Sequence, residues 1–237
     1  ATGSWASHEP GQHAGTPQLW NVPGSSAWPD SCHAAPDERS RGGERMASRR
    51  SRAYLAAMRL VERISAELGT TSYVWGGFAL DVYEGRVLRE HDDIDYLTVG
   101  LPALKPQLAG LFAAHGWPAK ELSNGDLSPR RHGLKMQLGQ IALGARVRWT
   151  YDGDRGYLEF PLAWLRPHPV RFCGLEVHVV EPELEYVTKC CPQLLNPDWR
   201  LREREIAARE RLRALLWAKG VDPEALYARI TLWREAP

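Results

Sequence analysis

The sequence predicts one α/β domain of the α+β kind, with a mixed, mostly antiparallel sheet, flanking helices and a helical C-terminal part. Three observations predict this class. Helical periodicity opens the regular part of the chain, short apolar runs bounded by turn residues fill its middle, and a long amphipathic stretch follows. With 237 residues, the chain is long enough to bury a substantial core.

The expected elements follow from these patterns. Glycines at 69, 116 and 220 stand where three helices should end. Asn196 followed by Pro197 is a favourable start for the last helix. The helices are expected over 47–68, 78–85, 102–116, 181–191 and 196–219, and the strands over 72–75, 93–99, 117–122, 135–143, 146–151, 156–161 and 172–180.

The first 44 residues differ in composition from the rest of the chain. They are rich in Pro, Gly, Ser and His, with one Leu, one Val and no Ile. Such a stretch buries too little apolar surface to offset its ordering entropy, so we expect an irregular, disordered tail over 1–44. The regular pattern begins near Met46, and a natural start there is our hypothesis. The remainder is expected to form a domain over 45–195 and a helical segment packed on it over 196–237.

Composition narrows the classes of function. The formal net charge is +1, so no strong field attracts nucleic acid or anionic lipid. Apolar runs are shorter than the roughly 20 residues that span a bilayer. We therefore expect a cytoplasmic protein with neither a membrane nor nucleic acid as its partner. The four cysteines lack C-x-x-C spacing, which predicts free thiols and neither a disulfide nor a zinc site.

The motif "REHDDIDYLTV" (89–99) places three carboxylates at the start of a strand. Side chains alternate along a strand, so Asp93 and Asp95 should share one face about 7 Å apart, with Asp92 on the other. Two carboxylates on a rigid strand offer the oxygen ligands that Mg²⁺ prefers. A solvated strand end with capping aspartates is the alternative interpretation of this motif taken alone.

The preceding "WGGFALD" places Gly76 and Gly77 between a strand and a helix. Glycines there let backbone N–H groups approach a phosphate closely. A plain tight turn is the commoner meaning of a Gly-Gly pair. A phosphate-binding turn followed by a metal-binding carboxylate pair is much rarer by chance, and the combination predicts a site for a metal-bound phosphate.

These residues resemble the nucleotidyltransferase superfamily that includes DNA polymerase β, and within it the small antibiotic nucleotidyltransferases acting on aminoglycosides and lincosamides. The resemblance rests on "GGFALDVYEGRVLREHDDID" (76–95). The matching positions are Gly76, Gly77, Ala79, Asp81, Gly85, Arg89, His91, Asp93 and Asp95. A looser match extends to "EPELEYVTK" (181–189), whose Lys189 corresponds to a lysine on the family's downstream helix.

The resemblance implies a polymerase β-like fold and a Mg²⁺-dependent transfer of a nucleoside monophosphate, AMP from ATP being the expected case. The acceptor would be a hydroxyl of a small molecule of the aminoglycoside or lincosamide type, and pyrophosphate would leave. Asp93 and Asp95 would be catalytic and would hold Mg²⁺, two ions in the family. The expected nucleotide- and phosphate-binding residues are Gly76, Gly77, Arg89, His91 and Lys189. For His91, a hydrogen bond that orders the loop is an equal alternative.

One family feature is missing from the pattern. The family places a third carboxylate on a neighbouring strand, and the strand expected to carry it, "RVRWTY", has Arg146 and Arg148 instead. The acidic residues nearby that cannot be aligned are Asp152, Asp154 and Glu159. Two rival functions therefore stay open: a nucleotidyltransferase acting on protein or RNA, as in toxin–antitoxin relatives, and a nucleotide-binding protein that no longer turns over. A homodimer also stays open, because family members often build the acceptor site partly from a second subunit.

Overall fold

A computed structural model describes residues 48–151, 156–190 and 202–234. The helices and strands belong to one compact unit, Met46–Pro237. The tail expected over 1–44 and the helix start expected at Asn196 lie outside the described residues. Among the residues that are described, no helix combines the length and the apolar character needed to cross a membrane.

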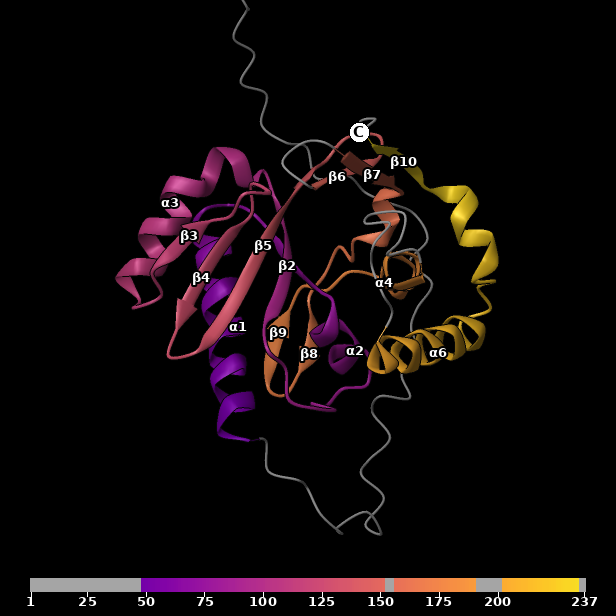
Figure 1. The fold of residues 1–237 in the computed structure, drawn as a ribbon, viewed down its shortest axis with the longest axis horizontal. Helices are drawn as coiled ribbons and strands as arrows, with labels where there is room; N and C mark the ends of the chain where they lie inside the picture. The colour runs from indigo at the N-terminus through magenta and orange to yellow at the C-terminus, as the bar shows by residue number, and fades with distance from the viewer. Residues whose placement is uncertain (1–47, 152–155, 191–201, 235–237) are drawn as a thin grey trace, which may run out of the picture. The chain divides into compact units, whose positions relative to one another are not determined.

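Helices and strands alternate in the first half of this unit, and strands dominate its middle (Figure 1). The elements are α1 (Arg49–Glu67), β1 (Ser72–Trp75), α2 (Gly77–Tyr83), β2 (Ile94–Val99), α3 (Leu101–Ala114), β3 (Ala119–Glu121), β4 (Leu127–Arg131), β5 (Leu134–Ala142), β6 (Val147–Tyr151), β7 (Gly156–Phe160), the 3₁₀ turn η3 (Leu162–Trp164), β8 (Val170–Phe172), β9 (Leu175–Val177), α4 (Pro182–Cys190), α6 (Glu203–Ala218), the 3₁₀ turn η4 (Glu224–Arg229) and β10 (Thr231–Arg234).

One mixed sheet forms the centre of the unit. Its strand order is β1-β2-β5-β6-β7-β10, with β4 beside β5 and β3 beside β4. Only β2 and β5 run parallel among the described pairs of this sheet, and the others are antiparallel. The long strand β5 pairs with β4 along its first part and with β6 along its last part. The predicted α+β class with a mostly antiparallel sheet is confirmed.

The two faces of the sheet form two separate cores. Ile94 and Leu138 belong to the core that includes residues of α1 and α3. Leu97 and Trp149 belong to the core that includes residues of α4 and α6. Figure 1 shows α1 and α3 to one side of β2, and α4 and α6 to the other. Because side chains alternate along β2, Asp95 shares a face with Leu97, on the side of α4 and α6.

The structure corrects one predicted strand. Residues 172–180 do not form a single strand: Phe172 ends β8, which pairs with β9 (Leu175–Val177) in a hairpin, and Val179 and Val180 form isolated bridges to Val74 and Leu165. The chain reverses at Cys173 and Gly174, whose φ angles are 46° and 76°. A left-handed backbone at two successive residues is a compact way to turn a hairpin, and Gly174 makes it accessible.

The structure contains two strands that were not predicted, and part of the predicted buried face of α6 is exposed. Residues 127–131 and 231–234, which the pattern did not predict as strands, form β4 and β10. The second of these pairs with β7, so the C-terminal segment is not purely helical. In α6, Leu212 and Leu216 are buried as predicted, but Ile206 is 49% exposed. The first turns of α6 lie beside the loop that precedes β2, where Arg204 pairs with Asp92.

Candidate active site

The turn between β1 and α2 brings the chain against a carboxylate of β2. Trp75, the last residue of β1, is the register partner of Asp95. The next residue, Gly76, has φ 76°, and a β-carbon there would lie 2.7 Å from Asp95 Oδ2. Both the backbone conformation and the lack of space require glycine at this position. Gly76 therefore allows the turn to pass directly over the Asp95 carboxylate.

Gly77 allows a second close approach. A β-carbon at Gly77 would lie 2.7 Å from Arg89 Nη2 and 2.8 Å from His91 Nδ1. The loop that precedes β2 thus packs its basic side chains onto the start of α2. The two glycines have different steric roles, one toward Asp95 and one toward the loop. These close approaches bring five of the six site residues expected between positions 76 and 95 into one small region: Gly76, Gly77, Arg89, His91 and Asp95.

His91 has a clear structural contact. The side chain is buried, its Nε2 lies 2.8 Å from Asp81 Oδ2, and its ring stacks on Phe78 with centroids 3.9 Å apart. Asp81, on α2, is also buried. This geometry favours the loop-ordering interpretation of His91: the histidine fastens the loop to α2 and so fixes the position of the aspartates that follow.

Asp93 and Asp95 lie close enough to influence each other. Burial and the charge of Asp93 raise the pKa of Asp95 to about 7, whereas the charges of Lys189 and Lys135 lower it. Lys135 Nζ is 3.3 Å from Asp93 Oδ2. A raised pKa means that the ionised form of Asp95 lacks sufficient positive charge nearby. The pair therefore fits a bound cation that takes oxygen ligands.

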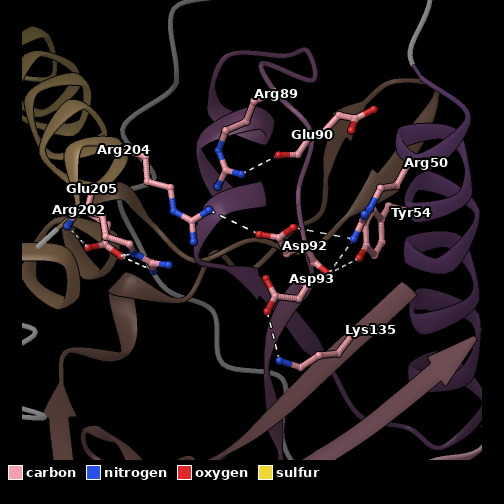
Figure 2. Close-up of polar contacts among 10 residues, drawn as sticks. All are labelled: Arg50, Tyr54, Arg89, Glu90, Asp92, Asp93, Lys135, Arg202, Arg204 and Glu205. Atoms are coloured by element: carbon pink, nitrogen blue, oxygen red, sulfur yellow. Dashed lines mark hydrogen bonds and ion pairs between the residues drawn. The ribbon is translucent and has the colours of Figure 1, made fainter. Parts of the chain in front are cut away.

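Asp92 turns away from this pair. Figure 2 shows its carboxylate directed toward Arg204 of α6 and Arg50 of α1, and Asp93 directed toward Lys135 of β5. The Asp92 pairs are long, at 3.5 Å to Arg204 Nη1 and 3.9 Å to Arg50 Nη2, and largely exposed. Such pairs contribute little to stability. Asp92 and Asp93 lie in the loop before β2, which begins at Ile94, so the loop and not strand alternation sets the direction of Asp92.

A site residue that the sequence reasoning missed is Glu185 of α4. It is completely buried, and one carboxylate oxygen accepts a hydrogen bond from the Gly76 N–H. Its Oε2 lies 3.4 Å from Lys189 Nζ, without a well-aligned hydrogen bond. Burial raises the pKa of Glu185, and Lys189 and the Gly76 N–H lower it. The Glu-Lys spacing of four residues in "ELEYVTK" was the available signal.

Glu185 ties α4 to the glycine turn. Because it holds Gly76, the helix is placed so that Lys189 lies near enough to lower the pKa of Asp95. The Gly76 N–H thus has a protein partner, and phosphate binding by Gly76 stays a prediction. Lys189, expected from the weaker part of the resemblance, is nevertheless brought to the carboxylate pair.

Arg89 lies above Gly77 and is partly desolvated. Burial, and then the charge of Arg204, lower its pKa, while nearby aspartates raise it. Its Nη1 donates to the carbonyl oxygen of Glu90 at 2.8 Å. An arginine held in this way keeps its charge and can still bind a phosphate through its other donors.

The third carboxylate was expected on the strand 146–151, and the structure shows that this strand is not a neighbour of β2. The parallel neighbour of β2 is β5, and its residue in register with Asp95 is Gln137. The strand 146–151 is one position further away, beyond β5. The β5 position that lies beside Asp95 therefore holds an amide.

The other acidic residues considered do not fill this place. Glu159 on β7 binds Arg148 Nη2 at 2.6 Å. Asp152 and Asp154 lie outside the described residues. Within residues 48–151, 156–190 and 202–234, no group of three or more His, Cys, Asp or Glu side chains could hold a metal ion. Asp93 and Asp95 are a carboxylate pair that could supply two oxygen ligands to a hard cation such as Mg²⁺.

Comparison with known proteins adds to this geometry. No model of a known protein family matches the chain, and no curated protein matches it. The solution structure of the antibiotic-resistance factor ANT(2'')-Ia matches with a TM-score of 0.59 and 18% identity, over 75% of this chain and 90% of that chain. The crystal structure of ANT(2'')-Ia in complex with adenylyl-2''-tobramycin matches with a TM-score of 0.57 and 19% identity, over 74% of this chain and 95% of that chain. The crystal structure of lincomycin-bound LnuA, a lincosamide antibiotic adenylyltransferase, matches with a TM-score of 0.52 and 14% identity, over 68% of this chain and 96% of that chain.

The chain has the nucleotidyltransferase fold. The fold expected from residues 76–95 is thereby confirmed. In this nucleotidyltransferase fold, the glycine turn joins β1 to α2, and the carboxylate pair stands at the start of β2.

Proposed function

We propose that the protein is a Mg²⁺-dependent nucleotidyltransferase that transfers a nucleoside monophosphate, AMP from ATP, to a hydroxyl of a small molecule and releases pyrophosphate. The observation that carries this proposal is the Asp95 carboxylate set against the turn at Gly76, with Asp93 close enough to raise its pKa. Support also comes from the shared fold, because ANT(2'')-Ia was solved with adenylyl-2''-tobramycin and LnuA with lincomycin. We therefore propose an acceptor of the aminoglycoside or lincosamide type.

Asp93 and Asp95 would hold Mg²⁺, which supplies positive charge for the triphosphate and for the oxygens that attack and leave. The raised pKa of Asp95 supports this role, because a carboxylate short of positive charge gains most from a bound cation. Gly76 keeps the space over Asp95 free of a side chain.

Two basic residues would bind the triphosphate itself. Arg89 is held over Gly77 by the folded loop, and its planar guanidinium suits two-pronged contact with phosphate. Lys189 is held by Glu185 on the side of Asp95 and would add a point charge. His91, buried against Asp81, would act by fixing the loop that carries Arg89 and Asp93.

Pyrophosphate release tests the proposal directly. Full-length protein would be incubated with Mg²⁺, each of the four nucleoside triphosphates, and a panel of acceptors that includes tobramycin and lincomycin. We expect release with ATP that depends on one of the antibiotics. Release only with RNA or protein would favour the toxin–antitoxin type of activity. Binding of Mg·ATP without release under any acceptor would show a nucleotide-binding protein that no longer turns over.

A further inference from the structure

The position beside Asp95 raises a chemical question. A hydroxyl that attacks phosphorus must lose its proton, and a positioned carboxylate is a common proton acceptor. Gln137 occupies the register position next to Asp95 on β5, and an amide cannot take a proton at ordinary pH.

The Gln137 side chain donates a hydrogen bond to a buried carboxylate, that of Asp126. Asp126 precedes β4 and is only 7% exposed. Its Oδ2 accepts hydrogen bonds from Gln137 Nε2 and from Asn124 Nδ2, both at 2.8 Å. Gln137 is thus the register partner of Asp95 on one side and the hydrogen-bond partner of Asp126 on the other. Asp126 precedes β4, which pairs with β5, and β5 in turn pairs with β2, the strand of Asp95.

The second oxygen of Asp126 is left for another partner. Among residues 48–151, 156–190 and 202–234, none donates a hydrogen bond to its Oδ1. A β-carbon added at Gly139 would lie 3.5 Å from this oxygen and 3.5 Å from Trp149 Nε1. Gly139 and Gln137 are two residues apart on β5 and share the face of Asp95. The lack of a side chain at Gly139 thus leaves a small space beside Oδ1, which Trp149 Nε1 and, at 3.6 Å from the added β-carbon, Leu97 Cδ2 also border.

The surroundings of Asp126 favour proton uptake. Burial raises its pKa, and the hydrogen bonds from Gln137 and Asn124 lower it, as does the charge of Lys105. Lys105 comes from α3 and is itself paired with Glu121 of β3 at 2.5 Å. The two groups that hold Asp126 directly are neutral amides, so protonation of its carboxylate breaks no direct ion pair.

We propose that Asp126 is the proton acceptor of the transfer reaction, in place of a carboxylate on β5. This inference rests on the proposed function. As the acceptor oxygen bonds to the α-phosphorus, its O–H bond breaks and the proton passes to Asp126 Oδ1. The bond between the α-phosphorus and the bridging oxygen breaks, and pyrophosphate leaves with that electron pair.

A purely structural role for Asp126 makes different predictions. The backbone of Asp126 already closes the turn, since its carbonyl accepts from the Leu122 N–H at 2.8 Å. If the side chain served only to hold that turn, then Asn124→Ala and Asp126→Asn would have similar effects. If the side chain takes the proton, only Asp126→Asn removes the reacting group.

The test uses single-turnover rates of the full-length protein with Mg·ATP and the antibiotic that supports release by the wild type. We expect Asp126→Asn to lower the rate by roughly 10²- to 10⁴-fold, with an unchanged dissociation constant for Mg·ATP, and to abolish the acid limb of the pH–rate profile. Asn124→Ala should keep most of the rate and move the acid limb to higher pH, because it removes a hydrogen bond that lowers the pKa of Asp126. As a control, Asp222→Asn alters an exposed carboxylate that caps the Glu224 N–H and should leave the profile unchanged.

A fourth variant moves the carboxylate. In Asp126→Asn/Gln137→Glu, the amide and the carboxylate exchange places across one hydrogen bond, which should restore the rate at least tenfold over Asp126→Asn and bring back an acid limb. The inference is overturned if the folded Asp126→Asn protein keeps the wild-type rate or acid limb, or if Asn124→Ala loses as much rate as Asp126→Asn. Absence of pyrophosphate release by the wild type with every acceptor would instead overturn the proposed function, and this inference with it.

Discussion

Two aspartates on the same side of the sheet, Asp95 partly buried and Asp126 buried, are held in opposite ways. Burial and then the charge of Asp93 raise the pKa of Asp95 to about 7, while the charges of Lys189 and Lys135 lower it. Asp126 is held by two neutral amides, with one lysine acting from a distance. A carboxylate with an acidic neighbour gains from a cation, whereas one held by amides can gain or lose a proton without breaking an ion pair. Burial alone therefore does not determine what a carboxylate can do; the groups that contact it decide whether it suits a cation or a proton.

The largest effect should follow the loss of charge at the cation-binding pair. Asp93→Asn and Asp95→Asn should each lower turnover by roughly 10³-fold or more, because the cation organises both the attacking and the leaving oxygen. Folding should hardly change, and thermal stabilisation by Mg·ATP should be weak in both variants. Asp92→Asn is the matched control, since Asp92 faces Arg204 and Arg50, and it should resemble the wild type. Equal losses at all three positions would contradict the assignment.

Next in size is the loss of the buried carboxylate on α4. Glu185→Ala leaves the Gly76 N–H without its acceptor and Lys189 without its partner. We expect about 3 kcal/mol of lost stability from such an unpaired buried charge, measured by urea unfolding. Glu224→Gln, which weakens the exposed pair with Arg213 and keeps an acceptor for the Tyr186 hydroxyl, should cost less than about 1 kcal/mol. If both variants cost the same, Glu185 does not anchor the glycine turn.

A smaller effect concerns pH and sharpens the contrast between the two aspartates. The pKa of Asp95 is raised from 3.8 to about 7, so between these values the folded state binds more protons than the unfolded state. The free energy of unfolding therefore falls as the pH rises through this window, by on the order of 2 kcal/mol. Urea unfolding in EDTA from pH 4.5 to 8 should show this loss in the wild type, and Asp95→Asn should lack it. A parallel pH dependence in both proteins would rule out Asp95 as its source.

The smallest effect is expected at Arg204. Its pair with Asp92 is 3.5 Å long and exposed at both ends, so Arg204→Ala should change stability by less than about 0.5 kcal/mol. Binding of Mg·ATP, measured by calorimetry at low and high salt, should weaken only modestly, because Arg204 is partnered outside the carboxylate pair. A loss of binding as large as that of Asp95→Asn would show that the first turn of α6 belongs to the triphosphate site.

The sequence predicted the parts of the site whose geometry is local. Gly76 and Gly77 lie on the turn after β1, and Asp93 and Asp95 lie at the start of β2, so a short stretch of sequence was enough to locate this candidate site. The role of Gln137 depends on the register between β2 and β5, which pairs residues about 40 positions apart and leaves no local pattern. For the same reason the third carboxylate was sought on the wrong strand.

Other misses have related physical causes. The strand β4 contains Ser128, Pro129 and two arginines, so it lacks the alternation that marks a strand. Its place in the sheet comes from pairing with β5. Glu185 lay in a helix that was correctly predicted, but only the tertiary structure shows that its carboxylate reaches the Gly76 N–H. The local pattern thus predicted the candidate carboxylates, and long-range pairing determined which groups surround them.

The contact between Glu185 and the Gly76 N–H determines whether the motif at residues 76–95 could be transferred to another protein. The glycine turn and the aspartates occupy about 20 contiguous residues, yet the acceptor that holds Gly76 is on α4, more than 100 positions later. Grafting "GGFALDVYEGRVLREHDDID" into another scaffold would transfer the glycines and the aspartates but not Glu185, which accepts the hydrogen bond from the Gly76 N–H. The smallest transferable unit therefore runs from β1 to α4, and loop exchange between related scaffolds should include both ends.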